Sequence, residues 1–205
     1  MLISFKRIPN RFSSLIFIIS SSIFIAIFCS ITLSCTTTKQ TPKILDEGVP
    51  NVHLAYQIEH VEIIDNRRNV SSGEMRIPAI STPKSYTKHF PVVTPEHRQE
   101  ILDFCKNNVK SSGRSVQAIV NLVDAYKEFS ATFSTERERG YVKMEVILYD
   151  LQTDKQLISC ESIGTFGIES NDADQQKMEK IYQYALRQAI YKCFRSIATS
   201  GNEEL

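Results

Sequence analysis

The longest amphipathic stretch of the chain, Asp172 to Ile197, constrains the fold most. Its apolar residues recur every three or four positions, which is the spacing of one face of a helix. They are Met178, Ile181, Tyr182, Ala185, Leu186, Ala189, Ile190, Cys193, Phe194 and Ile197. A broad apolar face is unstable in water and must lie against another layer. We therefore predict that the segment between Asn51 and Phe166 supplies strands that cover this helix.

The N-terminus has the layout of an export signal. Lys6, Arg7 and Arg11 precede a nearly unbroken apolar run from Leu15 to Ile31. The run is also close to the roughly 20 apolar residues that a membrane-spanning helix needs. An uncleaved N-terminal helix is therefore the alternative to a cleaved signal.

The residues that end this run favour cleavage. Thr32-Leu33-Ser34-Cys35 resembles a bacterial lipobox, although Thr32 stands where leucine is usual. The resemblance implies cleavage after Ser34 and lipidation of Cys35, and several acyl chains anchor a protein stably. The expected organisation is a signal peptide over 1–34, a lipidated flexible tether over 35–50, a single globular α+β domain over 51–200 and a tail over 201–205.

The charge of the mature chain argues against nucleic acid as a partner. The whole chain has 24 Lys and Arg against 23 Asp and Glu. Removal of residues 1–34 takes away three basic residues and no acidic one, which leaves 21 against 23. A slightly acidic domain lacks the basic footprint of a nucleic-acid-binding protein.

The remaining periodicities predict an α+β two-layer sandwich. A strand is expected over Asn51–Ile64, with a bulge near His60, and a helix from Thr94 to the stop at Ser111-Ser112-Gly113. A second strand starts at Ser115 and ends before a turn at Glu136–Gly140, and a third covers Tyr141–Tyr149. The fourth strand covers Gln156–Phe166, where Gly164 and Gly167 loosen its end, and Asn171 or Asp172 caps the final helix. An irregularity near Val123-Asp124 would keep Val116, Ala118, Val120, Leu122, Ala125, Phe129, Ala131 and Phe133 on the inward face. The order strand, helix, three-strand meander, helix places both helices on one face of an antiparallel-rich sheet.

A long basic loop is expected over 66–93, because Ser71 to Pro91 shows little periodicity and contains Gly73 and several prolines. Between Asn66 and Phe90 its acidic residue is Glu74, whereas its basic residues are Arg67, Arg68, Arg76, Lys84 and Lys88. One interpretation is a solvated loop. The other is a contact for an anionic envelope polymer or an acidic protein, made by these five basic side chains.

No catalytic constellation is present in the sequence. Gly-rich phosphate loops, HExxH and GxSxG are absent. His53, His60, His89 and His97 fall on different elements, so no metal site or cofactor is expected. Cysteine is the one candidate nucleophile, but Cys105, Cys160 and Cys193 share the apolar faces of their elements and are expected to be buried thiols, with Cys160–Cys193 as the pair that could form a disulfide.

The chain resembles the YajG-type envelope lipoproteins. The resemblance is carried by the lipobox-like Cys35, the first strand running into Asp65-Asn66-Arg67, and the hairpin from Tyr141–Val146 to Ser159–Ser162 before an amphipathic helix. It implies a periplasmic domain anchored in the outer membrane, in a family whose biochemical role is largely unsettled.

We therefore expect a non-catalytic, lipid-anchored binding or assembly module of the bacterial outer membrane. Its partner would be an envelope protein, or peptidoglycan or lipopolysaccharide, met by the basic loop or by the outer face and edge of the long hairpin. The alternative functions are a thiol-dependent envelope enzyme and a membrane protein held by an uncleaved N-terminal helix.

Overall fold

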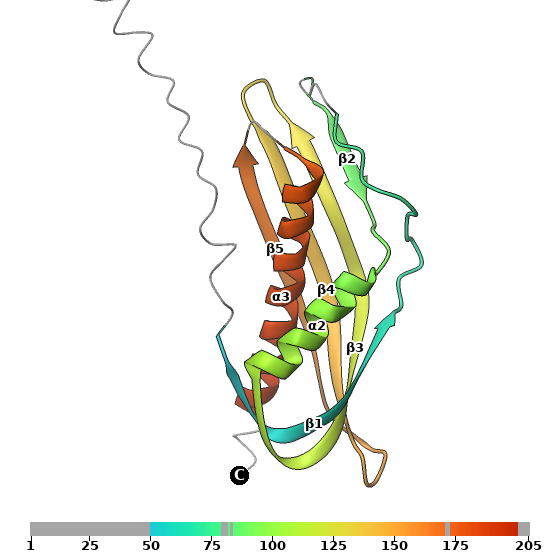
Figure 1. Cartoon of the computed structure of the whole chain (residues 1–205), viewed down its shortest axis with the longest axis vertical. Coiled ribbons are helices and arrows are strands. Elements are labelled where there is room, and N and C mark those ends of the chain that lie inside the picture. The colour runs from blue at the N-terminus through green and yellow to red at the C-terminus, as the bar shows by residue number, and fades with distance from the viewer. Residues whose placement is uncertain (1–49, 79–81, 83, 171–172, 201–205) are drawn as a thin grey trace, which may run out of the picture. The chain divides into compact units, whose positions relative to one another are not determined.

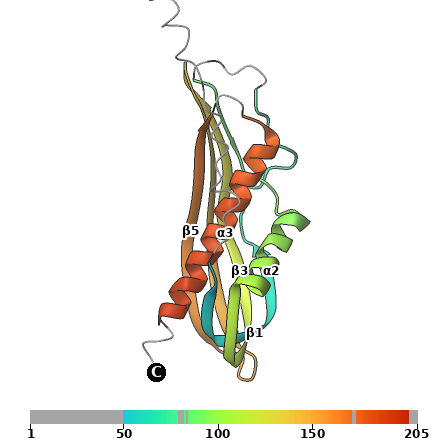
Figure 2. The same ribbon diagram turned by 60° about the vertical axis from the view of Figure 1, so that its left-hand side comes forward.

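A five-stranded mixed sheet with two helices on one face forms the described part of the protein (Figures 1 and 2). The computed structural model describes residues 50–78, 82, 84–170 and 173–200. The elements in chain order are β1 (Val52–Asp65), β2 (Tyr86–His89), α2 (Pro95–Asn108), β3 (Val109–Ala131), β4 (Glu136–Asp150), β5 (Gln156–Ser170) and α3 (Gln175–Ser200). The fold is therefore α+β with helices on one face.

The strand order is β1-β3-β4-β5, and β2 also pairs with β3. β1 runs parallel to the first part of β3, whereas β2 is antiparallel to its last part. β3, β4 and β5 are antiparallel neighbours. The expected element order lacked β2, and the parallel pair β1–β3 makes the sheet mixed. The expected irregularities near His60 and near Val123 are confirmed by shifts of register at both places.

The predicted start of α2 is confirmed, but its predicted end is wrong. The Thr94 hydroxyl accepts from His97 N–H, and Thr94 N–H donates to Nδ1 of His97, which completes a capping box. The helix ends at Asn108, and Val109 already belongs to β3. Gly113 has a φ of +103°, the conformation that a helix stop would use, but it lies inside β3. A Cβ added there would be 2.5 Å from the Ala55 carbonyl oxygen.

The predicted apolar face of α3 is confirmed, since all ten of its residues are buried. This face rests directly on the sheet because two strands have glycine beneath it. A Cβ added at Gly164 of β5 would lie 2.0 Å from the Ala185 carbonyl oxygen, and one added at Gly140 of β4 would lie 2.9 Å from that of Ile181. Gly164 was expected to loosen the end of a strand, but it provides space for close helix packing. The expected caps Asn171 and Asp172 lie outside the described residues, and Asp174 accepts the N–H of Lys177 at 2.6 Å.

The hairpin between β3 and β4 turns earlier than predicted. Its turn is Thr132–Thr135, because the Thr132 side chain bonds the backbone there, and Glu136–Gly140 belongs to β4. Phe133, which was expected to face the core, therefore leaves the sheet and is 91% exposed. Part of the expected loop is also ordered, because β2 pairs with β3, and Ser71 forms a bridge with Pro91.

Candidate functional site

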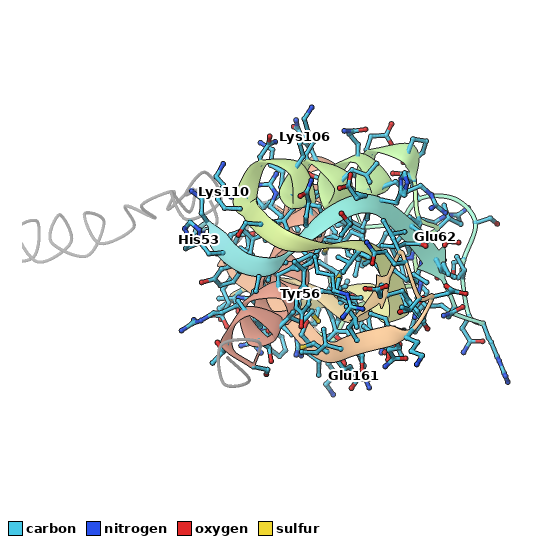
Figure 3. The ribbon with its side chains drawn as sticks, turned by 90° about the horizontal axis from the view of Figure 1, so that it is seen from below. His53, Tyr56, Glu62, Lys106, Lys110 and Glu161 are labelled. Carbon is cyan, nitrogen blue, oxygen red and sulfur yellow. The ribbon has the colours of Figure 1, made fainter. Side chains whose placement is uncertain are left out.

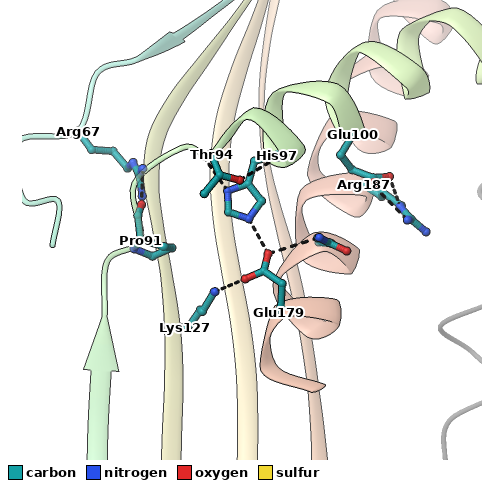
Figure 4. A network of polar contacts seen from close by, with 9 residues as sticks. Arg67, Pro91, Thr94, His97, Glu100, Lys127, Glu179 and Arg187 are labelled. Carbon is teal, nitrogen blue, oxygen red and sulfur yellow. Dashed lines mark hydrogen bonds and ion pairs between the residues drawn. The ribbon is translucent and has the colours of Figure 1, made fainter. Parts of the chain in front are cut away.

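Arg67, the first of the predicted contact residues, is used by the fold itself. Its side chain is 3% exposed and makes two hydrogen bonds of 2.7 Å to the Asp65 carboxylate. It also donates to the main-chain oxygens of Pro91 (2.8 Å; Figure 4) and Ala125 (3.2 Å). Burial would raise the pKa of Asp65, but the bonds and charge of Arg67 outweigh it and leave that pKa lowered. Arg67 thus ties the end of β1 to β3 and to the segment that precedes α2.

The other four predicted contact residues are exposed but do not converge. Arg68 lies two residues after Asn66, whose N–H donates to the Leu122 oxygen of β3. Lys84 N–H donates to the Ala131 oxygen at the end of β3. About nine strand residues separate these points, which corresponds to roughly 30 Å. Arg76 lies on the connecting segment, and Lys88 lies over the Tyr126 ring at 3.7 Å. The structure therefore does not gather these cations into one anion site.

A polar network that the sequence did not predict joins both helices to β3 (Figure 4). Nε2 of His97 lies 2.6 Å from Oε1 of Glu179, and Lys127 forms an ion pair with the other oxygen of the same carboxylate. The His97 ring packs edge-on against Tyr182, with 5.0 Å between centroids. Burial raises the pKa of Glu179, but the bonds to His97 and Lys127 prevail and lower it to about 2. The polar groups of this network bind one another, so its evident role is to hold the helices in place.

Two of the three described cysteines, Cys105 and Cys193, have a thiol pKa that is shifted away from that of a nucleophile. Cys105 and Cys193 are buried, Cys160 is half-buried, and all three are free thiols. Burial raises the pKa of Cys105 to about 12 and that of Cys193 to about 12. The Cys193 thiol donates to the Cys160 main-chain oxygen at 2.9 Å, so the two residues are neighbours without a disulfide. A nucleophilic thiol requires a lowered pKa.

The outer face, which is the side of the sheet away from α2 and α3, is covered by no described helix (Figure 2). Even-numbered residues of β4 from Val142 to Leu148 are fully buried under the helices, so the odd-numbered residues point outward. The register then gives two apolar rows across the strands. The aromatic row is Phe90, Tyr126 and Tyr141, and the aliphatic row is Ile119 and Ile147.

Polar and charged groups on the outer face largely bond one another. Lys143 lies 2.9 Å from Glu161, Asn121 donates to Glu145, and Gln117 donates to Glu62. Tyr126 stacks on Tyr141 with 4.7 Å between ring centroids. Polar groups that already bond one another need little from a partner, which leaves the aliphatic row available for contact. In the aromatic row, Lys88 lies over the Tyr126 ring at 3.7 Å.

The free edge of β5, where we expected strand addition, is partly occupied by α3. The Gln188 side chain accepts from Thr165 N–H at 2.8 Å, and Lys192 donates to the Ile163 main-chain oxygen at 2.8 Å. These groups would otherwise be open to a partner strand. Strand addition at the middle of β5 therefore requires displacement of both side chains.

Two exposed lysines, Lys106 and Lys110, lie at the end of the sheet where β1 begins. His53 pairs with Lys110 in the register, and Figure 3 shows the two side by side near Lys106. A hollow of about 470 Å³ at the same end is lined by Asn51, Val52, His53, Tyr191, Arg195, Ala198 and Thr199. The predicted lipidation site, Cys35, precedes this end in the sequence and lies outside the described residues.

The helices and the ionisable side chains of the described residues were compared with the requirements of a membrane span and of a metal site by their length, hydropathy and grouping alone. None of the helices among them is long and apolar enough to cross a membrane. In the same part of the chain, no three His, Cys, Asp or Glu side chains are grouped so that they could hold a metal ion.

Comparisons with known proteins give structural similarity alone. No family model matches the sequence, and no curated protein matches it. Among solved structures, a Xanthomonas campestris protein of family-model DUF330 is similar with a TM-score of 0.45 and 11% identity, over 76% of this chain and 89% of that one. A minor lipoprotein from Acinetobacter baumannii is similar with a TM-score of 0.37 and 10% identity, over 54% of this chain and 88% of that one. At these levels neither similarity assigns a family or an activity.

Proposed function

We propose that this chain is a non-enzymatic binding module of the bacterial envelope, which is anchored by lipid on Cys35 and holds an envelope protein on its outer face. The observation that carries the proposal is the uncovered outer face, where aromatic and aliphatic rows lie among polar groups that already bond one another. Ile163 of β5 and Val123 of β3 are 43% and 39% exposed, although the sheet has a well-filled core on its other side. Apolar groups of this kind on an ordered sheet favour a protein partner.

The lipid anchor is supported by the sequence from Lys6 to Cys35 and by the charge of the end that follows the tether. Lys106 and Lys110 are exposed there, and cationic side chains near an anchor are attracted to anionic headgroups. We propose that this end faces the outer membrane and that the rest of the domain extends into the periplasm.

A protein partner fits better than an anionic polymer bound through the basic loop. Arg67 is buried against Asp65, and Arg68 and Lys84 are far apart along β3. A polymer held by exposed lysines would be released steeply by salt, whereas an apolar interface would not.

Photo-crosslinking in living cells tests the proposed face. A photoreactive phenylalanine analogue at Ile163 of the full-length chain should give a defined adduct with one envelope protein. The matched control places the analogue at Lys180, an exposed position on α3. Adducts at both positions, or at neither, would contradict the proposal. Mass spectrometry of the mature N-terminus tests the anchor, since a chain that retains Met1 and has no lipid would exclude it.

A further inference from the structure

The turn that joins β3 to β4 presents the most exposed large apolar side chain of the described residues. Phe133 is 91% exposed, and Tyr86 of the adjacent strand β2 is 60% exposed. Tyr86 pairs with Ser130, three residues before Phe133, so the two rings belong to the same end of the sheet. We call this end the β3–β4 tip, which comprises residues 130–135 together with 82 and 84–86 (Figure 1, top).

The turn holds Phe133 outward on an ordered backbone. Thr132 N–H donates to the Thr135 main-chain oxygen at 2.8 Å. The Thr132 hydroxyl accepts from Ser134 N–H at 3.3 Å and from Thr135 N–H at 3.1 Å. These amides are satisfied within the turn, so the turn can leave water at little cost in lost hydrogen bonds. An aromatic ring on such a turn loses little further freedom when it binds.

The neighbouring segment is fixed to the same end and adds a positive charge. Lys84 N–H donates to the Ala131 oxygen at 3.0 Å, and Ala131 N–H donates to the Ser85 oxygen at 2.8 Å. Lys84 has a φ of +72°, which is uncommon for a residue with a side chain. Among the described residues of the β3–β4 tip, Lys84 is the charged one and most of the others are Ser and Thr. Beside the tip, Glu128 accepts from the Tyr86 hydroxyl at 3.4 Å.

We propose that the β3–β4 tip is an anchor that inserts Phe133 into an apolar pocket of a protein partner whose rim is acidic. A buried aromatic residue at the centre of a contact is the typical source of most binding energy at a protein interface. The exposed charge of Lys84 favours an acidic rim by charge complementarity.

The position of the tip argues for a protein rather than the anchoring membrane. β1 begins beside Val109, the first residue of β3, whereas the tip follows Ala131, the last one. The tip therefore lies at the far end of a 23-residue strand from the point where the proposed tether joins. One phenylalanine also supplies less apolar area than stable membrane attachment requires.

This inference rests on the proposed function in one respect, namely that the chain acts by binding a protein. The outer face and the tip are separate surfaces, so they are separately testable. A photoreactive analogue at Phe133 of the full-length chain, in cells, should give an adduct whose crosslinked peptide comes from an apolar pocket bordered by Asp or Glu. Leu151 is the matched control, because it is a 42% exposed apolar residue in the β4–β5 turn.

Truncation then measures the contribution of the ring. Phe133→Ser should reduce recovery of the crosslinked partner in affinity purification by about tenfold or more, whereas Phe133→Trp and Leu151→Ser should leave it nearly unchanged. An adduct from Ile163 without one from Phe133 would overturn this inference and leave the proposed function standing. Adducts from neither position would overturn both.

The chain has no tryptophan, so Phe133→Trp also provides a unique fluorescent probe. Its emission in the purified full-length protein should shift to the blue on addition of the partner identified by crosslinking. Vesicles of phosphatidylethanolamine and phosphatidylglycerol should give no shift, and brominated lipid should not quench the emission. Quenching by brominated lipid would overturn the proposal and assign the tip to a bilayer.

Discussion

Nε2 of His97 lies 2.6 Å from Oε1 of Glu179, and this contact joins the N-terminal turns of the two helices. Nδ1 of the same ring accepts the Thr94 N–H at 3.2 Å, so the proton of a neutral His97 is on Nε2 and is donated to Glu179. A single imidazole thus completes the cap of α2 and fixes the position of α3.

Replacement of His97 should destabilise the fold more than loss of the cap alone. We expect His97→Ala to lower the free energy of unfolding by about 2–3 kcal/mol and Thr94→Ala by about 1 kcal/mol, measured by urea denaturation. His97→Gln should fall between them, because glutamine can close a capping box but has both polar atoms on one carbon and cannot also reach Glu179 on the other side. If His97→Ala and Thr94→Ala lower the free energy of unfolding by the same amount, the link from His97 to Glu179 contributes nothing.

The ion pairing of Glu179 should make stability depend on pH in acid. Its pKa is lowered from 4.5 to about 2, so the folded state favours the charged carboxylate. The resulting stabilisation is complete above pH 4.5 and is lost as the pH falls from 4.5 towards 2. The stability difference between the wild-type protein and Glu179→Gln should therefore shrink over this range. A difference that stays constant from pH 6 to pH 2 would contradict the assignment.

Gly164 should be intolerant of any side chain. A Cβ there would lie 2.0 Å from the Ala185 oxygen and 2.6 Å from the Ala189 nitrogen, both in the backbone of α3. We expect Gly164→Ala to cost about 3 kcal/mol or more, since α3 must move away from β5. Gly167→Ala is the matched control on the same strand, because its nearest contact would be 3.2 Å from the Glu138 oxygen. Similar losses in the two variants, measured by thermal unfolding, would exclude this packing.

Much of the helix layer was readable from the sequence because helix periodicity and capping are local. The ten buried residues of α3 and the Thr94 cap required no knowledge of distant contacts. Phe133 was misplaced because strand alternation does not show where a strand ends, and the hydrogen bonds of Thr132 decide the turn. The role of Arg67 was also hidden, because its partners Pro91 and Ala125 lie 24 and 58 residues away in the sequence.

The thiols should react in an order set by burial. Cys160 is half-buried, whereas Cys105 and Cys193 are buried and have pKa values raised to about 12. In the native protein, an alkylating reagent should modify Cys160 first and the other two only on unfolding. Mass spectrometry of peptides after timed alkylation gives the order. Rapid modification of Cys193 before Cys160 would show that α3 does not cover β5 as described.

Gln188 and Lys192 should keep β5 from pairing with a second chain. Their side chains bond Thr165 N–H and the Ile163 oxygen, and Lys192 also lies 3.5 Å from Gln188. Open strand edges are templates for association, and charged side chains at an edge oppose it. We expect Gln188→Ala combined with Lys192→Ala to form dimers or larger species at concentrations where the wild-type protein is unchanged, as measured by light scattering. Lys180→Ala, which removes an exposed charge elsewhere on α3, is the control. If the double variant associates no more than this control, the edge is protected by something other than these two side chains.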